Sequence, residues 1–210
     1  MLNWQQLDIE LFHNAEIFPG KVGDKLRKRH LSNAWDLAKI SGYTLEFGVY
    51  NALTLNALAR HCKPEIVWGF DSFQGLPEFW NMHNNQGLAA GYFAVEQLPQ
   101  VESNAKLVAG WFNDTLPSWL IENVDPVRLL HIDCDIYSSA HFVLNTLNSR
   151  ILPGTVIVFD DFYAWHNPSL YTNWNQGEYL ALTHWMKTFD REIEILYRTN
   201  YFQCSLLVRK

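Results

Sequence analysis

The sequence has few cysteines, a shortage of positive charge and no long hydrophobic run. Its cysteines, Cys62, Cys134 and Cys204, lie far apart and lack the paired spacing of a disulfide framework or a zinc site. No stretch approaches the roughly 18 apolar residues of a membrane helix, and the first residues do not follow the pattern of a secretory signal. We therefore expect a soluble, cytoplasmic protein without a membrane partner.

The balance of charge argues against a nucleic-acid partner. The chain has 16 lysines and arginines against 22 acidic residues, so its formal net charge is −6 and a basic face could form only locally. The one basic cluster, residues 25–30, is interpreted as the solvated face of a helix near the N-terminus.

The chain does have the apolar material for a sizeable core. Of its 210 residues, 48% are hydrophobic, which predicts a single domain over residues 1–210. After an N-terminal helical extension of about residues 1–42, apolar runs alternate with helical periodicity. Because the runs are apolar throughout, they predict parallel strands covered by helices on both faces. The predicted strands are 43–49, 65–72, 105–112, 127–135 and 155–162, and the predicted helices are 24–41, 52–62, 116–123 (starting near Pro117), 138–151 and 177–189.

The end of the chain follows a different pattern. Two alternating segments, 192–199 and 201–210, flank Asn200 and predict an antiparallel hairpin. The predicted fold is therefore an α/β doubly wound sheet, mostly parallel and completed by an antiparallel pair. Two long polar and aromatic segments, 79–100 and 162–177, interrupt the pattern, and loops of this length commonly act as lids.

Three of the apolar runs stop on carboxylates: Asp71, then Asp133 with Asp135, then the pair Asp160–Asp161. Ligands of parallel α/β sheets gather at the carboxyl ends of the strands, so these acids mark the edge of a site. Asp71 follows the first βα turn by about 20 residues, a spacing that suits an acid holding the hydroxyls of a ribose. The alternative for Asp71 is a helix cap.

The later acids predict a metal site. Acids that meet at neighbouring strand ends repel one another unless a cation lies between them, and Mg²⁺ prefers such oxygen ligands. Side chains alternate along a strand, so Asp160 and Asp161 oppose each other unless the chain turns there. We predict Asp133, Asp160 and Asp161 as the ligands, with Asp135 in support or capping the next helix. The alternative is a set of separate capping acids.

Two further features complete the candidate site. Gly48, in the first βα turn, permits a close approach of the backbone to a ligand, and the nearby Glu46 could engage an ammonium group or order water. The dinucleotide pattern G-x-G-x-x-G is absent. Imidazoles titrate near neutrality, so His83, His141 and His166 are candidate bases.

Five segments carry a resemblance to a known family: LEFGVYNALTLNALA, GFDSFQGLPE, GWFNDTLP, LLHIDCDIYSS and LPGTVIVFDDF. In this order, between residues 45 and 162, they resemble the class I S-adenosylmethionine-dependent methyltransferases, and more closely the macrocin O-methyltransferase-like, Mg²⁺-dependent branch that acts on sugars and other natural products. The resemblance implies a Rossmann-like, seven-stranded sheet of order 3-2-1-4-5-7-6.

The resemblance also implies roles for individual residues. It places Glu46 and Gly48 at the methionine portion of S-adenosylmethionine, Asp71 at the ribose, and Ser72, Gly110, Trp111 and Phe112 near the adenine. Asp133, Asp160 and Asp161 would hold Mg²⁺, with Asp133 also next to the cofactor. Two positions depart from the pattern: Asn51–Ala52 stand where relatives often carry glycines, and Ile136 stands where related catechol-type enzymes have a lysine.

The predicted function is divalent-metal-assisted O-methyl transfer to a hydroxyl of a small molecule, such as a sugar or a natural-product glycoside. His83 is the favoured base, because segment 79–100 could fold over the acceptor, and the metal-site carboxylates, Asp133 among them, are the other candidates. A homo-oligomer through the aromatic-rich N-terminal part is compatible with the sequence.

Other readings explain less of the sequence. A nucleotide-sugar glycosyltransferase would use the D-x-D at 133–135 but leaves residues 46–49 without a role. A phosphatase of the haloacid-dehalogenase type needs a lysine that residues 136–159 lack. A non-catalytic homologue that binds the cofactor remains an open alternative.

Overall fold

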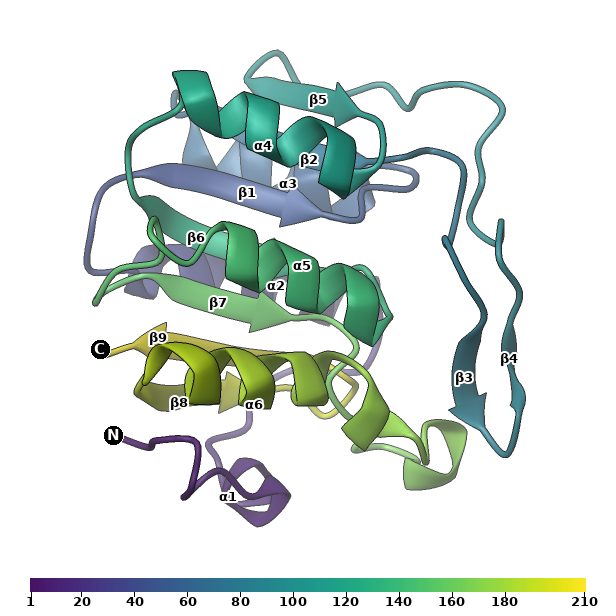
Figure 1. The fold of residues 1–210 in the computed structure, drawn as a ribbon, viewed down its shortest axis with the longest axis vertical. Coiled ribbons are helices and arrows are strands. Elements are labelled where there is room, and N and C mark those ends of the chain that lie inside the picture. Colours follow the sequence, from purple (N-terminus) through teal and green to yellow (C-terminus); the bar gives the residue numbers. More distant parts are fainter.

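A computed structural model describes all residues, 1–210, and a seven-stranded sheet runs through its middle (Figure 1). The strand order is β5-β2-β1-β6-β7-β9-β8; the first five of these strands are parallel, and β9 runs antiparallel to both of its neighbours, β7 and β8. Apart from a separate two-stranded hairpin, this is the predicted order 3-2-1-4-5-7-6, which is confirmed. The bounds are β1 Tyr43–Phe47, β2 Val67–Asp71, β5 Ala105–Ala109, β6 Val127–Ile132, β7 Val156–Phe159, β8 Ile193–Arg198 and β9 Cys204–Val208.

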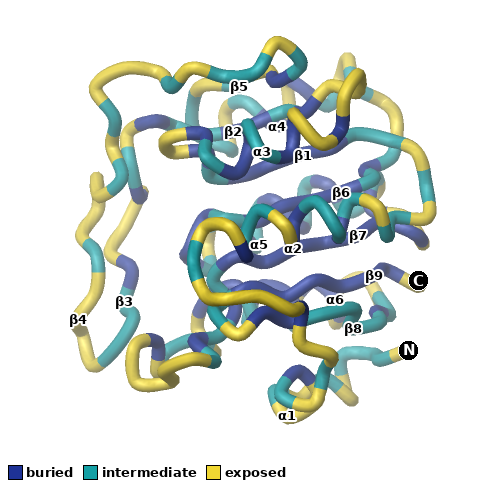
Figure 2. Tube along the Cα trace, turned by 180° about the vertical axis from the view of Figure 1, so that it is seen from behind, coloured by how far each residue is buried: buried dark blue, intermediate teal, exposed yellow.

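Helices cover both faces of the sheet (Figure 1). Successive residues of β6 point to opposite faces: Leu130 packs into the core beneath one set of helices, whereas Leu129 packs into the core beneath the other. Because both faces are covered, the central parallel strands β1, β6 and β7 are almost entirely buried, whereas the edge strand β5 is partly exposed (Figure 2). One face carries α4 (Phe112–Glu122), α5 (Tyr137–Thr146) and α6 (Glu178–Phe189), and the other carries α2 (Asp24–Leu37) and α3 (Leu53–Cys62).

The region after β5 differs from the prediction. The strand ends at Ala109, and α4 begins at Phe112 rather than near Pro117, which lies inside the helix. Gly110 turns the chain with a φ of +140°, and the Trp111 carbonyl then accepts the first hydrogen bonds of the helix. Pro117 is tolerated within the helix because it lies on its exposed side and removes a single helical hydrogen bond.

The two long segments interrupting the pattern contact each other. Segment 79–100 contains the hairpin of β3 (Trp80–His83) and β4 (Gln86–Leu88), which stands beyond the carboxyl ends of the parallel strands (Figure 1). The Asn173 N–H donates to the Met82 carbonyl at 3.2 Å, and the Trp80 ring packs edge-on against Tyr171 at 5.6 Å. Within 162–177 the chain forms two 3₁₀ turns, Pro168–Leu170 and Trp174–Gln176.

The N-terminal part of the chain is packed on the sheet. A short helix, α1 (Ile9–His13), is followed by α2, whose buried residues Leu26, His30, Leu31 and Ala34 face β6 and β7. Helix α2 thereby brings its first turns to the carboxyl ends of these strands. None of the helices combines the length and hydrophobicity required to cross a membrane.

Candidate functional site

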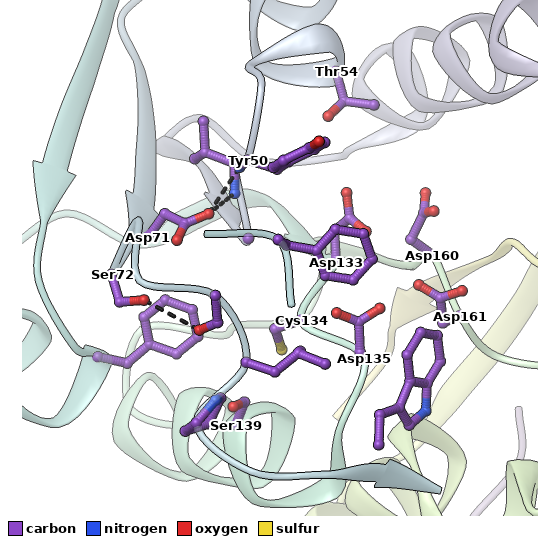
Figure 3. Close-up of a pocket in the computed structure, with 18 of the residues that line it drawn as sticks. Tyr50, Thr54, Asp71, Ser72, Asp133, Cys134, Asp135, Ser139, Asp160 and Asp161 are labelled. Carbon is purple, nitrogen blue, oxygen red and sulfur yellow. Dashed lines mark hydrogen bonds between the residues drawn. The ribbon is translucent and has the colours of Figure 1, made fainter. Parts of the chain in front are cut away.

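A cavity of about 530 Å³ opens at the carboxyl ends of β1, β2, β6 and β7. It lies where the strand order reverses direction between β1 and β6, the usual ligand position in an open α/β sheet. Asp71 and Ser72 lie on one side of the cavity, and Asp133, Asp160 and Asp161 lie on the other (Figure 3). The cavity therefore has two chemically distinct ends.

Most of the residues predicted for cofactor binding line this cavity, namely Gly48, Asp71, Ser72, Trp111, Phe112 and Asp133. Gly110 and Glu46 do not line it. Ser72 stabilises its own turn, since its Oγ donates to the Gly75 carbonyl at 3.3 Å and accepts from the Gln74 N–H at 3.0 Å. The structure thus brings six of the eight predicted residues together.

Asp71 organises the turn that follows β1. One carboxylate oxygen accepts hydrogen bonds from the N–H groups of Val49 and Tyr50, at 2.7 and 2.8 Å, and the other accepts from the Phe73 N–H at 2.7 Å. A carboxylate offers about four lone-pair positions, so Asp71 retains capacity for a ligand hydroxyl. Its orientation is fixed before any ligand arrives.

Gly48 is required by the packing of the turn. Its φ is +94°, and a Cβ there would lie 1.7 Å from the Asp133 carbonyl oxygen. The Asp133 N–H in turn donates to the Phe47 carbonyl at 2.9 Å. The first turn and the end of β6 are therefore in direct backbone contact, which holds Asp133 beside the cavity.

Glu46 lies behind the cavity, where it is fully buried. It accepts a hydrogen bond from the Thr54 hydroxyl at 3.1 Å and lies 2.9 Å from His131 Nδ1. His131 Nε2 lies 3.3 Å from Asp160, so the imidazole is held between two carboxylates. Burial opposes the charged imidazole, but the hydrogen bonds to Asp160 and Glu46 raise the pKa of His131 to about 10. His131 is therefore a buried cation, which sequence reasoning did not identify.

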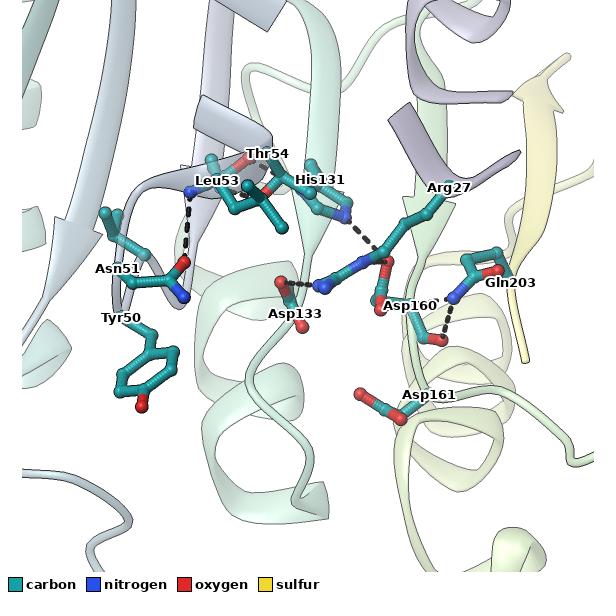
Figure 4. Close-up of polar contacts among 12 residues, drawn as sticks. Arg27, Tyr50, Asn51, Leu53, Thr54, His131, Asp133, Asp160, Asp161 and Gln203 are labelled. Atoms are coloured by element: carbon teal, nitrogen blue, oxygen red, sulfur yellow. Dashed lines mark hydrogen bonds and ion pairs between the residues drawn. The ribbon is translucent and has the colours of Figure 1, made fainter. Parts of the chain in front are cut away.

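Arg27 provides a second cation, at the acidic end of the cavity (Figure 4). Its Nε donates to Asp160 at 2.7 Å and its Nη2 donates to Asp133. Burial alone would raise the pKa of Asp160, but the charges of Arg27 and His131 hold it below its usual value. Side chains of the protein itself therefore pair with Asp133 and Asp160 at this edge of the sheet.

The position of Arg27 corrects the interpretation of residues 25–30 as a solvated helix face. Lys25 and Arg29 are exposed as expected, whereas Arg27 turns toward the sheet. Arg27 precedes the buried His30 by three residues and the buried Leu31 by four, so helical periodicity could have placed it on the inner face.

The acids form two groups. Atoms of His131, Asp133 and Asp160 lie within 4.8 Å of one another, a spacing that could hold a metal ion, and Asp161 is outside this set. The backbone N–H of Asp161 donates to Glu178 at 3.1 Å, and burial followed by the charge of Asp160 raises the pKa of Asp161 to about 7. Glu178, at the start of α6, is fully buried and was missed because 17 residues separate it from Asp161.

None of the three predicted histidines lines the cavity. His83 lies on β3, with Nδ1 2.9 Å from the Thr172 hydroxyl and Nε2 2.9 Å from the Asn84 amide. His141 stacks on Tyr137, and His166 packs against Tyr201 and Phe202.

The topology and the cavity at the strand switch define a Rossmann-like methyltransferase fold, as comparison with solved structures shows. The calicheamicin methyltransferase CalS11 superposes with a TM-score of 0.66 at 22% identity, over 88% of this chain and 78% of that one. The O-methyltransferase TomG of Streptomyces achromogenes, solved with S-adenosylmethionine, gives a TM-score of 0.52 at 15% identity, over 90% and 82% of the two chains.

The family follows from the sequence itself. Residues 25–181 match the macrocin O-methyltransferase (TylF) family, so the chain belongs to it and the resemblance is confirmed. A tetracenomycin 4'-O-methyltransferase of Streptomyces olivaceus is 29% identical over 46% of this chain and 41% of its own length. Demethyldecarbamoylnovobiocin O-methyltransferase of Streptomyces niveus is 27% identical over 59% and 53%. The matches span about half the length of these relatives.

Proposed function

We propose that the protein transfers a methyl group from S-adenosylmethionine to a hydroxyl of a small molecule, a sugar or a glycosylated natural product. One observation carries the proposal: a member of the macrocin O-methyltransferase family has a cavity of about 530 Å³ with Asp71 at one end and Asp133, Asp160 and Asp161 at the other. The substrate class is supported by the S. olivaceus relative, whose name gives a rhamnosyl-bearing tetracenomycin as its substrate.

The cofactor would lie toward Asp71. Its carboxylate is oriented by three backbone N–H groups and keeps lone pairs for the ribose hydroxyls. Trp111 and Phe112 at the start of α4 offer aromatic surface for the adenine, and Gly48 leaves room for the methionine portion. This arrangement directs the sulfonium methyl toward Asp133.

The acceptor would lie toward the acids. Methyl transfer needs the hydroxyl oxygen in line with the methyl–sulfur bond and a group that takes the hydroxyl proton. Asp133 and Asp161 are among the carboxylates that line the cavity, and we assign this task to one of them. His83, the base that the sequence favours, lies outside the cavity and could take the proton only after a movement of the β3–β4 hairpin.

A divalent metal fits this arrangement poorly while Arg27 is in place. Asp133, Asp160 and Asp161 supply the oxygen ligands that Mg²⁺ prefers. However, Arg27 holds both Asp133 and Asp160, and His131 also contacts Asp160. Mg²⁺ at these carboxylates therefore requires Arg27 to withdraw, and no step of the proposed reaction is assigned to a metal.

Calorimetry and a methyl-transfer screen test the function together. Titration with S-adenosylhomocysteine should give one site per chain, and S-adenosylmethionine labelled on its methyl group should label one or more members of a panel of rhamnosides and other glycosides. Titration with UDP-sugars is the control. Binding of a UDP-sugar without S-adenosylhomocysteine would favour the glycosyltransferase alternative, and cofactor binding without any transfer would favour the non-catalytic one.

A further inference from the structure

The guanidinium of Arg27 lies between Asp133 and Asp160, the strand-end acids that were predicted to share a metal ion (Figure 4). From this position we infer that Arg27 supplies the positive charge that a divalent ion would supply there, and that the protein works without a metal. The inference rests on the proposed methyl transfer.

The helix holds Arg27 firmly in this position. Leu26 and Leu31 are each 2% exposed, and His30 Nε2 lies 3.0 Å from the Ser205 hydroxyl of β9. The Arg27 side chain keeps only 23% of its surface exposed, and Asp160 keeps 7%. The cation is thus part of the packed structure, as a bound ion would be.

The two acids that a metal ion would bridge already have a cationic partner. Arg27 pairs with both Asp133 and Asp160, so each of these acids has a cationic partner from the protein. Gln203 Nε2 also donates to Asp160, at 3.3 Å. A divalent ion would have to break the ion pairs of Arg27 to gain the same carboxylates, at a cost in desolvation and pairing.

The free atoms of the ion pair point to its role in the reaction. Arg27 Nη1 and Asp133 Oδ1 have no partner within the protein, and both residues line the cavity. Asp133 Oδ1 would accept the hydroxyl proton while Arg27 Nη1 donates to the acceptor oxygen or to a neighbouring hydroxyl. The oxygen lone pair then forms a bond to the methyl carbon, the carbon–sulfur bond breaks with its electrons going to sulfur, and the proton goes to Asp133.

The test compares the wild-type protein with Arg27→Ala, using Mn²⁺ as the probe. We expect the wild type to bind no Mn²⁺ in electron paramagnetic resonance titrations at millimolar Mn²⁺, and its methyl transfer to be unchanged by EDTA. Arg27→Ala should bind one Mn²⁺ per chain, gain thermal stability with Mg²⁺ and lose roughly 100-fold in transfer, in part restored by Mg²⁺. Adding Asp133→Asn to this variant should abolish the Mn²⁺ binding.

Lys25→Ala, on the exposed side of the same helix, is the matched control and should behave as the wild type. Arg27→Lys keeps one positive charge and guards against a folding defect; it should stay metal-independent. Stoichiometric Mn²⁺ binding by the wild type, or loss of transfer with EDTA, would overturn the inference. Absence of S-adenosylhomocysteine binding would instead refute the proposed function, because the Mn²⁺ titration needs no cofactor.

Discussion

Glu46 and His131 stand opposite each other on neighbouring strands, and their side chains meet 2.9 Å apart without exposure to solvent. Because Glu46 has no access to the cavity, it acts on the site through His131 and Asp160. Contact with the methionine portion, the role that the family resemblance implies for Glu46, stays a prediction, and Glu46 lies behind the cavity lining in this structure.

Breaking this buried pair should destabilise the protein. His131→Leu leaves Glu46 buried without its cation, and we expect a loss of about 3–5 kcal/mol in the free energy of unfolding, measured with urea. The double variant Glu46→Leu/His131→Leu should recover part of the loss because neither charge is then stranded. A loss below about 1 kcal/mol for the single variant would show that His131 is not a structural cation.

Removal of the Asp71 carboxylate should weaken cofactor binding. Asp71→Ala loses both the ribose partner and the anchor of the first turn, so we expect affinity for S-adenosylhomocysteine to fall more than roughly tenfold in calorimetry. Ser72→Ala, which removes one hydroxyl of the cavity lining and two hydrogen bonds of its own turn, should weaken binding less. Unchanged affinity of Asp71→Ala would move the ribose away from the end of β2.

His83→Ala separates the two kinds of candidate base. His83 lies outside the cavity, so we expect the kcat of methyl transfer at neutral pH to change by no more than about threefold, whereas removal of a true base costs roughly 100-fold or more. Asp133→Asn should show the larger effect with cofactor affinity retained. A steep fall in kcat for His83→Ala would show that the hairpin closes over the acceptor and would assign the base to His83.

Because of His30, we expect the folded protein to lose stability in mild acid. Burial, opposed by the charge of Asp160 and reinforced by that of His131, lowers the pKa of His30 to about 4. Folded His30 is therefore neutral, and its contribution is complete above the unfolded pKa of about 6.5 and lost as pH falls toward 4. The shift corresponds to about 3 kcal/mol.

Chemical denaturation at several pH values measures this contribution. The free energy of unfolding of His30→Gln should vary less between pH 6.5 and 4 than that of the wild type, since Gln does not titrate. Equal slopes for the two proteins would show that His30 is already charged in the folded state.

The sequence predicted most of the fold. It predicted the acids of the candidate site but not the groups that pair with them. Runs such as 127–132 and 156–159 carry apolar residues on both faces, so they predicted buried parallel strands and placed Asp133 and Asp160 at neighbouring strand ends. The partners of these acids come from distant segments. Arg27 precedes Asp133 by 106 residues, and a run of basic residues normally indicates a solvated helix face. The pairing of Arg27 with Asp133 becomes apparent only from the packing of α2 on the sheet.

The close contact between Gly48 and the Asp133 carbonyl joins the first turn and the end of β6 into one rigid unit beside the cavity. Any side chain at position 48 would push the first turn away from the end of β6 and would displace the lining of the cavity on both sides of this contact. Substitutions that reshape the cavity are therefore expected to be tolerated better in its outer walls than at this contact.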